Sequence, residues 1–229
     1  MEAIVLAGGL GTRLRSVVPD LPKCMAPING TPFLSYLIDH LILQGVTHFI
    51  FALGYKSNEF LHFLETKLPN KNYSIVIEEE PLGTGGAIKL AASKTTKKDV
   101  IALNGDSLFK ANLFDLMQFH LGKKSSCTLA LKPMQQFERY GSVEINNHAT
   151  ITSFKEKQLI ESGLINGGVY AINIPSFLEK NLPTTFSMEK EYLEKYATEG
   201  KFYGHVQEAY FIDIGIPEDF TRAQKELLS

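Results

Sequence analysis

Short apolar runs alternate with amphipathic stretches along the first half of the chain. The runs are bounded by turn-forming residues, as buried strands are, and apolar residues between them recur at helical spacing, as at Phe60, Leu61 and Leu64. The first helix would have Thr31 as its N-cap and Pro32 at its first position. Strands alternating with helices favour a mostly parallel sheet covered on both faces. We expect strands at 2–6, 48–53, 74–77 and 100–103, and helices at about 31–44, 57–68, 83–92 and 114–121.

In the second half, short strand patterns follow one another with little helix between them. No linker rich in Pro, Gly or Ser divides the chain. We therefore expect one Rossmann-like α/β domain over 1–229, with a mixed, mostly parallel sheet flanked by helices. The pattern predicts strands at 127–131, 142–145, 151–154, 168–172, 202–206 and 210–212, and helices at 187–197 and from Pro217 onward.

Composition narrows the possible functions. The chain has 229 residues, 44% of them hydrophobic, and a formal net charge of −2. Without an overall basic field we expect neither nucleic acid nor a membrane as a partner, so phosphate chemistry would depend on local charges. Cys24 and Cys127 have no metal-binding spacing. We expect free thiols in a soluble cytoplasmic protein without signal peptide or membrane span, with a single disulfide as the alternative.

The stretch AGGLGTRLR, residues 7–15, has the glycine content of a phosphate-binding loop. No Lys-Ser or Lys-Thr pair follows the glycines, which excludes a Walker P-loop. Leu14 stands where the dinucleotide fingerprint has its third glycine, and Pro19 and Pro22 prevent a long helix behind it. A plain tight turn remains as an alternative, but it does not account for the cations nearby.

Two cations flank this loop. Glycines let backbone N–H groups approach phosphate oxygens closely, and Thr12 adds a hydroxyl. Arg13 carries a guanidinium that can bind phosphate through several donors, whereas Lys23 provides a point charge from an extended segment. The combination predicts a cradle for a triphosphate.

Several motifs, taken in order, resemble the signature of the sugar-1-phosphate nucleotidylyltransferases, over nearly the whole chain. Among these enzymes, the resemblance is nearest to the short guanylyltransferases that act on D-glycero-α-D-manno-heptose 1-phosphate. It implies a nucleotide-binding half at about 1–125 and a sugar-phosphate-binding half at about 126–229. The motifs are GGLGTRLR, PKCMAPINGTPFL, EEEPLGTGGA (78–87), LNGDSLF (103–109), SFKEKQ (153–158), INGGVY (165–170) and FIDIGIPEDF (211–220).

The implied reaction is attack by a sugar 1-phosphate oxygen on the α-phosphorus of a nucleoside triphosphate, with pyrophosphate as the leaving group. Because a phosphate nucleophile is already anionic near neutral pH, catalysis needs positioning and charge neutralisation rather than a strong base. The resemblance assigns the catalytic roles to Arg13, Lys23, Asp106 and Asp213.

Asp106 and Asp213 each follow or end a predicted strand, where open α/β sheets place ligands. Converging there, the two carboxylates would hold Mg²⁺, which prefers one or two carboxylates together with phosphate oxygens and water. The alternative for each residue is a cap of a turn or helix. Asp219 is expected to be an exposed residue in the first turn of the last helix.

The resemblance also supplies the binding residues. Asn166-Gly167 and Tyr140-Gly141, as bare sequence, could equally be turns. The nucleotide would lie against Leu6, Ala7, Gly8, Gly9, Gly11, Thr12, Arg13, Lys23, Glu78, Gly83 and Asp106. The sugar phosphate would lie against Tyr140, Gly141, Glu156, Lys157, Asn166 and Gly167.

The nucleobase is inferred from Glu78, which in the resembling family lies near the base. A carboxylate offers only acceptors, which suits the adjacent N1–H and N2–H₂ donors of guanine, so we expect GTP. The alternatives are a uridylyl- or thymidylyltransferase for a hexose or amino-sugar phosphate, and a catalytically silent nucleotide-sugar-binding subunit. A glycosyltransferase would need a D-x-D motif, whereas Asp106 stands alone between Gly105 and Ser107. A homo-oligomer is compatible with the sequence.

Overall fold

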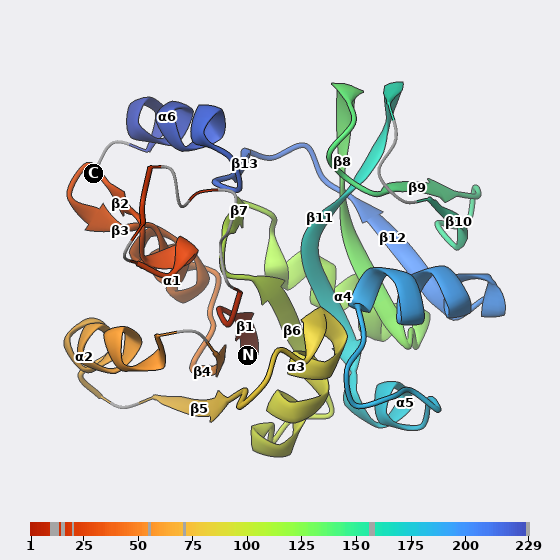
Figure 1. Cartoon of the computed structure of the whole chain (residues 1–229). Helices are drawn as coiled ribbons and strands as arrows, with labels where there is room; N and C mark the ends of the chain where they lie inside the picture. The colour runs from red at the N-terminus through yellow and green to blue at the C-terminus, as the bar shows by residue number, and fades with distance from the viewer. Residues whose placement is uncertain are drawn as a thin grey trace.

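The computed structural model describes residues 1–9, 14, 17–19, 21–54, 56–70, 72–155 and 159–227. Within these residues one large sheet forms the centre of the molecule, with the strand order β10-β9-β11-β6-β1-β4-β5, and with β8 between β11 and β12. Helices pack on both faces of it (Figure 1). The strands of this sheet are β1 (Glu2–Leu6), β4 (His48–Leu53), β5 (Tyr73–Ile77), β6 (Asp99–Asn104), β8 (Cys127–Phe137), β9 (Ser142–Ile145), β10 (Ile151–Lys155), β11 (Ile160–Asn173) and β12 (Phe202–Val206).

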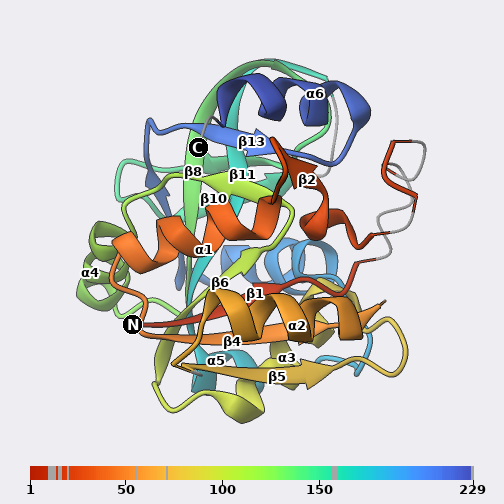
Figure 2. The same ribbon diagram turned by 90° about the vertical axis from the view of Figure 1, so that its left-hand side faces the viewer.

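The first half forms the parallel part of the sheet, because β1 pairs in parallel with both β4 and β6, and β4 with β5. Alternate side chains of each strand reach opposite faces. In β4, Phe49 and Phe51 join the core cluster beneath two helices, whereas Ile50 joins the cluster on the other face. The helices of the first face, seen in Figure 2, are α1 (Phe33–Leu43) and α2 (Ser57–Lys67), and the second face carries α3 (Gly83–Ala91). The mixed α/β fold is confirmed.

The second half is mostly antiparallel. β11 pairs antiparallel with β6, β8 and β9, and only β12 and β8 pair in parallel. β8 and β11 are much longer than predicted, and their paired ends project beyond the rest of the sheet (Figure 1). The polar residues Gln135 and Gln136 end the apolar pattern at the sequence level, but backbone pairing with β11 continues through this stretch.

The remaining elements lie at the borders of the sheet. α4 (Leu113–Lys123) and α6 (Pro217–Glu226) pack on the same face as α1, and α5 (Ile174–Leu178), which was not predicted, packs on the face of α3. Two short ladders complete the fold: β2 (Pro27–Ile28) with β3 (Thr31–Pro32), and β7 (Ser107–Phe109) with β13 (Phe211–Asp213).

Two local predictions need correction. Thr31 does not cap α1, because Thr31 and Pro32 pair with Pro27 and Ile28 and the helix begins at Phe33. The helix predicted from Ser187 does begin there, with the Ser187 hydroxyl accepting hydrogen bonds from two backbone N–H groups, but Met188–Glu194 is a π-helix. π-Helical turns occur frequently at functional sites.

Cys24 and Cys127 are both free and buried, which confirms the prediction of free thiols. Among the described helices, none has the length and apolar character needed to span a bilayer.

Candidate active site

A cavity of about 630 Å³ opens where β1 and β6 end at their carboxyl termini. Ligands of open α/β sheets bind at this edge. The predicted residues that line it are Leu6, Ala7, Gly8, Gly9, Lys23, Glu78, Gly83, Asp106, Tyr140, Gly141, Asn166 and Asp213. The predicted Gly167 does not line the cavity, and a Cβ there would lie 2.4 Å from Cδ1 of Phe109. The predicted residues Gly11, Thr12, Arg13, Glu156 and Lys157 lie outside the described residues.

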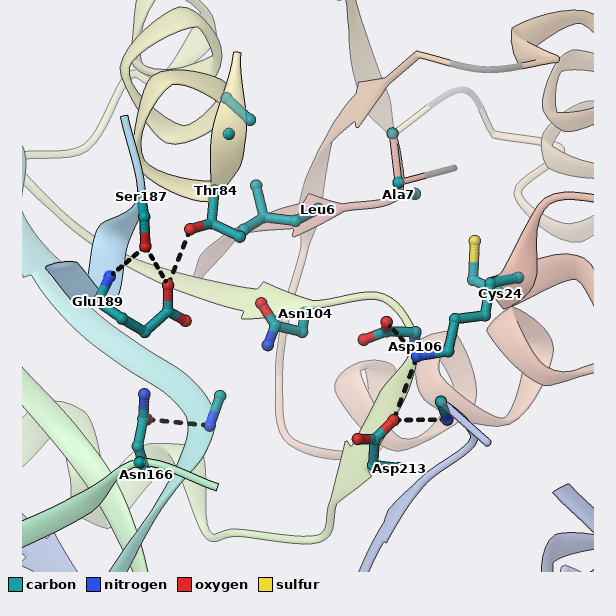
Figure 3. Close-up of a pocket in the computed structure, with 18 of the residues that line it drawn as sticks. Leu6, Ala7, Cys24, Thr84, Asn104, Asp106, Asn166, Ser187, Glu189 and Asp213 are labelled. Carbon is teal, nitrogen blue, oxygen red and sulfur yellow. Dashed lines mark hydrogen bonds and ion pairs between the residues drawn. The ribbon is translucent and has the colours of Figure 1, made fainter. Parts of the chain in front are cut away.

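Asp106 and Asp213 meet at one end of the cavity (Figure 3). The small ladder of β7 and β13 brings them together, because Ser107 pairs with Asp213 and the N–H of Ile214 donates to the Asp106 carbonyl over 3.1 Å. Lys23 lies between the two carboxylates. Its Nζ is 2.6 Å from Asp106 Oδ2 and 3.3 Å from Asp213 Oδ1.

In this group, the positive charge of Lys23 lies between the carboxyl groups of Asp106 and Asp213. Burial, reinforced by the charge of Asp106, raises the pKa of Asp213 despite the opposing effect of Lys23. Burial would lower the pKa of Lys23, but the charges of Asp106 and Asp213 outweigh it, so the net shift is upward and the ammonium stays charged. Asp106 and Asp213 therefore bind a cationic group together, and in this structure that group is the Lys23 ammonium.

Gly215 makes this arrangement possible. Its N–H donates to Asp213 Oδ1 over 2.7 Å, and a Cβ at this position would lie 2.9 Å from both Lys23 Nζ and Asp213 Oδ1. A larger residue would push the ammonium and the carboxylate apart. In the sequence motif IDIGIP (212–217), Gly215 thus lets the backbone come close enough to donate a hydrogen bond to the Asp213 carboxylate.

Glu78 lies at another side of the cavity, directly after β5. Its Oε2 accepts a hydrogen bond from the Leu82 N–H over 2.9 Å, and a Cβ on Gly8 would lie 2.4 Å from Oε1. Burial raises the pKa of Glu78, and the Leu82 N–H opposes this shift. The carboxylate is thus fixed against the backbone of the glycine-rich loop while it lines the cavity.

The glycines after Glu78 have a packing role that sequence reasoning missed. Gly83 has φ +72°, and a Cβ there would lie 2.5 Å from the Phe186 carbonyl oxygen. A Cβ on Gly85 would lie 2.1 Å from the Phe186 ring, and the Gly85 N–H donates to Phe186 O over 3.0 Å. Because these glycines have no side chain, the segment before the π-helix can pack closely against the start of α3.

Glu189 is a cavity residue that the sequence did not indicate. Its Oε2 accepts hydrogen bonds from Thr84 Oγ1 over 3.0 Å and from Ser187 Oγ over 2.9 Å (Figure 3). Its Oε1 accepts one from the Tyr170 hydroxyl over 3.4 Å, and that hydroxyl accepts one from Asn166 Nδ2 over 2.7 Å. In sequence, Ser187 and Glu189 have only the pattern of a helix start, so no signal marked the carboxylate as part of a site.

Arg139 also lines the cavity without having been predicted, although it precedes Tyr140. Its partner is Asp219, for which the sequence prediction of an exposed position is wrong. Asp219 does lie in the first turn of α6, but it is only 6% exposed, and Arg139 and Arg222 both form ion pairs with it. A buried carboxylate needs such partners.

Comparison with known proteins identifies the family. The family model described as "Nucleotidyl transferase" matches residues 2–229. The chain belongs to this family. Nucleotidyl transferases similar to it include the D-glycero-α-D-manno-heptose 1-phosphate guanylyltransferase of Aneurinibacillus thermoaerophilus, 50% identical over 233 residues, which cover 99% of this chain and 98% of the relative. The enzyme of the same name from Campylobacter jejuni is 41% identical over 220 residues, covering 96% and 97%.

A solved structure supports the same family. HddC from Yersinia pseudotuberculosis, complexed with GMP-PN, superimposes with a TM-score of 0.87 at 37% identity, covering 98% of both chains. The family expected from the motifs is therefore confirmed.

Proposed function

We propose that the protein condenses GTP with D-glycero-α-D-manno-heptose 1-phosphate to give GDP-heptose and pyrophosphate. The names of the two similar guanylyltransferases support the substrates. The observation that carries the proposal is the Lys23–Asp106–Asp213 group in a cavity that Glu78 and Glu189 also line. Incubation of the enzyme with both substrates tests it: mass spectrometry should detect GDP-heptose, and the absence of this product would contradict the proposal.

The cofactor in this proposal is Mg²⁺, held by Asp106 and Asp213. The donor set fits, because two carboxylates already share one cationic group, and Mg²⁺ is commonly bound by one or two carboxylates with phosphates and water. Among the described residues no group of three or more His, Cys, Asp or Glu side chains could hold a metal ion, so the other ligands would be phosphate oxygens and water. When bound, Mg²⁺ would neutralise phosphate charge.

The side chains position the reacting groups. Asp106 and Asp213 would hold the cation near the phosphates, and Lys23, on the same wall, would stabilise negative charge on the phosphates and on the leaving pyrophosphate. The sugar 1-phosphate supplies its own anionic nucleophile, so no general base is required. Arg13, which lies outside the described residues, is proposed to act on the same triphosphate.

Glu78 is proposed to accept hydrogen bonds from guanine N1–H and N2–H₂. Replacing it with Gln substitutes one acceptor by a donor, so kcat/KM for GTP should fall by about 10- to 100-fold, while UTP and dTTP gain relative to GTP. Glu79→Gln is the matched control, because its exposed neighbouring side chain does not line the cavity. Steady-state rates with four nucleoside triphosphates measure the effect, and an unchanged nucleotide preference in Glu78→Gln would remove the basis for this assignment.

Glu189, with Asn166 nearby, is proposed to bind sugar hydroxyl groups. Its Oε2 is anchored by Thr84 and Ser187, which leaves Oε1, with only a long contact to Tyr170, to accept from the ligand. Glu189→Gln should raise KM for the sugar phosphate about tenfold and leave KM for GTP unchanged. The exposed Glu194 on the same helical segment provides the control variant Glu194→Gln. A rise in KM for GTP alone would refute the role of Glu189 in sugar binding.

A further inference from the structure

Arg139 lies in the turn between β8 and β9 and lines the same cavity as Asp106 and Asp213, which are called the acid pair below. The cations that line the described part of the cavity are Lys23, Arg139 and Lys190, against four acids, Glu78, Asp106, Glu189 and Asp213. Lys23 is already engaged by two of these acids. A cavity that accepts two polyanions needs further positive charge, and Arg139 is placed to supply it.

The guanidinium of Arg139 is held so that part of it stays open to a ligand. Nη2 donates to Asp219 Oδ2 and, over 3.3 Å, to the Tyr140 hydroxyl, and the guanidinium carbon lies 5.5 Å from the centre of the Tyr140 ring. Within the described residues, the hydrogen bonds from Arg139 all use Nη2. The N–H donors of Nη1 and Nε can therefore bind an anion, and a planar guanidinium suits phosphate oxygens.

The position of Arg139 is fixed relative to the acid pair. The Tyr140 ring packs edge-on against Phe211, with centroids 5.3 Å apart, and Phe211 packs edge-on against Phe109 at 5.9 Å. Phe109 and Phe211 belong to β7 and β13, the ladder that places Asp106 and Asp213. Asp219, on α6 shortly after this ladder, also holds the guanidinium through an ion pair with Nη2.

Arg139 lies on the side of the cavity lined by the residues predicted to bind the sugar phosphate, namely Tyr140, Gly141 and Asn166. It is followed by Tyr140 and Gly141, and the Gly141 carbonyl accepts a hydrogen bond from the Asn166 N–H over 3.0 Å. Asn166 in turn bonds Tyr170, a partner of Glu189. Glu78 and Gly8, by contrast, meet at the ends of β5 and β1.

We propose that Arg139 binds the phosphate of the sugar 1-phosphate, and that Asp219 is the positioning residue that holds its guanidinium at the cavity wall. This inference rests on the proposed function. It adds a second cationic contact next to the acid pair, on the substrate whose phosphate oxygen attacks. Because Asp219 keeps a second partner in Arg222, loss of Arg139 does not leave a buried carboxylate alone.

The test compares Arg139→Met and Arg139→Lys with Arg222→Met. Arg222 binds the same Asp219 carboxylate but does not line the cavity, which makes it the matched control. KM for D-glycero-α-D-manno-heptose 1-phosphate should rise about 10- to 100-fold in Arg139→Met, as expected for loss of a charge-assisted hydrogen bond, and by less in Arg139→Lys. KM for GTP should stay within about twofold in all three variants, a difference smaller than the loss of one hydrogen bond.

Three outcomes separate the possibilities. An Arg139→Met enzyme with unchanged KM for the sugar phosphate, or with equal rises in both KM values, would overturn the phosphate-binding role, even if thermal unfolding showed reduced stability. A rise in KM for GTP alone would move Arg139 to the triphosphate and overturn the inference as stated. If the wild-type enzyme forms no product, the proposed function fails; the results on the variants count against Arg139 only when the wild-type enzyme is active.

Discussion

Asp213→Asn should abolish turnover, lowering kcat by at least about 10³-fold, because the amide lacks the negative charge with which Asp213 would hold the proposed cation near the phosphates. Asp106→Asn should have a similar effect, since the two carboxylates act as a pair around Lys23. Pyrophosphate release under saturating substrates measures both. Normal activity in the two variants would refute the assignment of the acid pair as the centre of the site.

The fold should survive the Asp213 substitution. Asn keeps an oxygen that can accept from the Gly215 N–H. Since the pKa of Asp213 is raised in the folded state, its ionised form is less favourable there than in the unfolded chain, and this penalty begins as the pH rises above the unfolded pKa and is complete above the folded pKa. A neutral amide removes the penalty, so the thermal midpoint near neutral pH should not fall. Asp39→Asn, at an exposed ion pair with Lys67, is the control and should keep full activity.

Lys23→Met should have the second large effect. We expect kcat to fall by about 10²- to 10³-fold, because the phosphates lose a positive charge that would stabilise the transition state. The same substitution should increase the affinity of the nucleotide-free enzyme for Mn²⁺, since Lys23 Nζ now occupies the space between Asp106 and Asp213. Mn²⁺ binding, measured by electron paramagnetic resonance, reports this change without any turnover.

The two measurements on Lys23→Met are independent. Lys67→Met removes a half-buried lysine that pairs with Asp39, does not line the cavity, and should alter neither quantity. If Lys23→Met retained wild-type turnover, Lys23 would not act on the phosphates. If its affinity for Mn²⁺ matched that of the wild type, the carboxylate pair would not be the cation site.

The sequence predicts the parts of the site that lie at the ends of regular elements. Asp106 follows β6 and Asp213 ends β13, and a strand pattern with a terminal acid is visible without knowledge of tertiary structure. It could not predict that the Lys23 ammonium lies between these acids, because that depends on how the 21–26 segment folds back onto the ladder of β7 and β13. The expected contact of Lys23 with phosphate stays a prediction, and in this structure the Lys23 ammonium contacts the two carboxylates.

Residues whose roles depend on long-range pairing were missed for the same reason. The buried Asp219 pairs with Arg139, which is distant in sequence, and a helix-start pattern alone favours exposure. Glu189 becomes a cavity residue because the π-helix and the glycines of α3 bring its carboxylate to Thr84. Similarly, β8 and β11 extend through polar residues because each strand satisfies the backbone groups of the other.

In the proposed reaction, the enzyme joins GTP to D-glycero-α-D-manno-heptose 1-phosphate. Its most direct test is pyrophosphate release measured for ATP, GTP, UTP and dTTP, each combined with a panel of sugar 1-phosphates that includes mannose, glucose and N-acetylglucosamine 1-phosphate. We predict the highest kcat/KM for GTP with the heptose phosphate. No release with any pair would indicate a silent nucleotide-sugar-binding subunit, and a preference for another nucleotide or for a hexose phosphate would equally contradict the account.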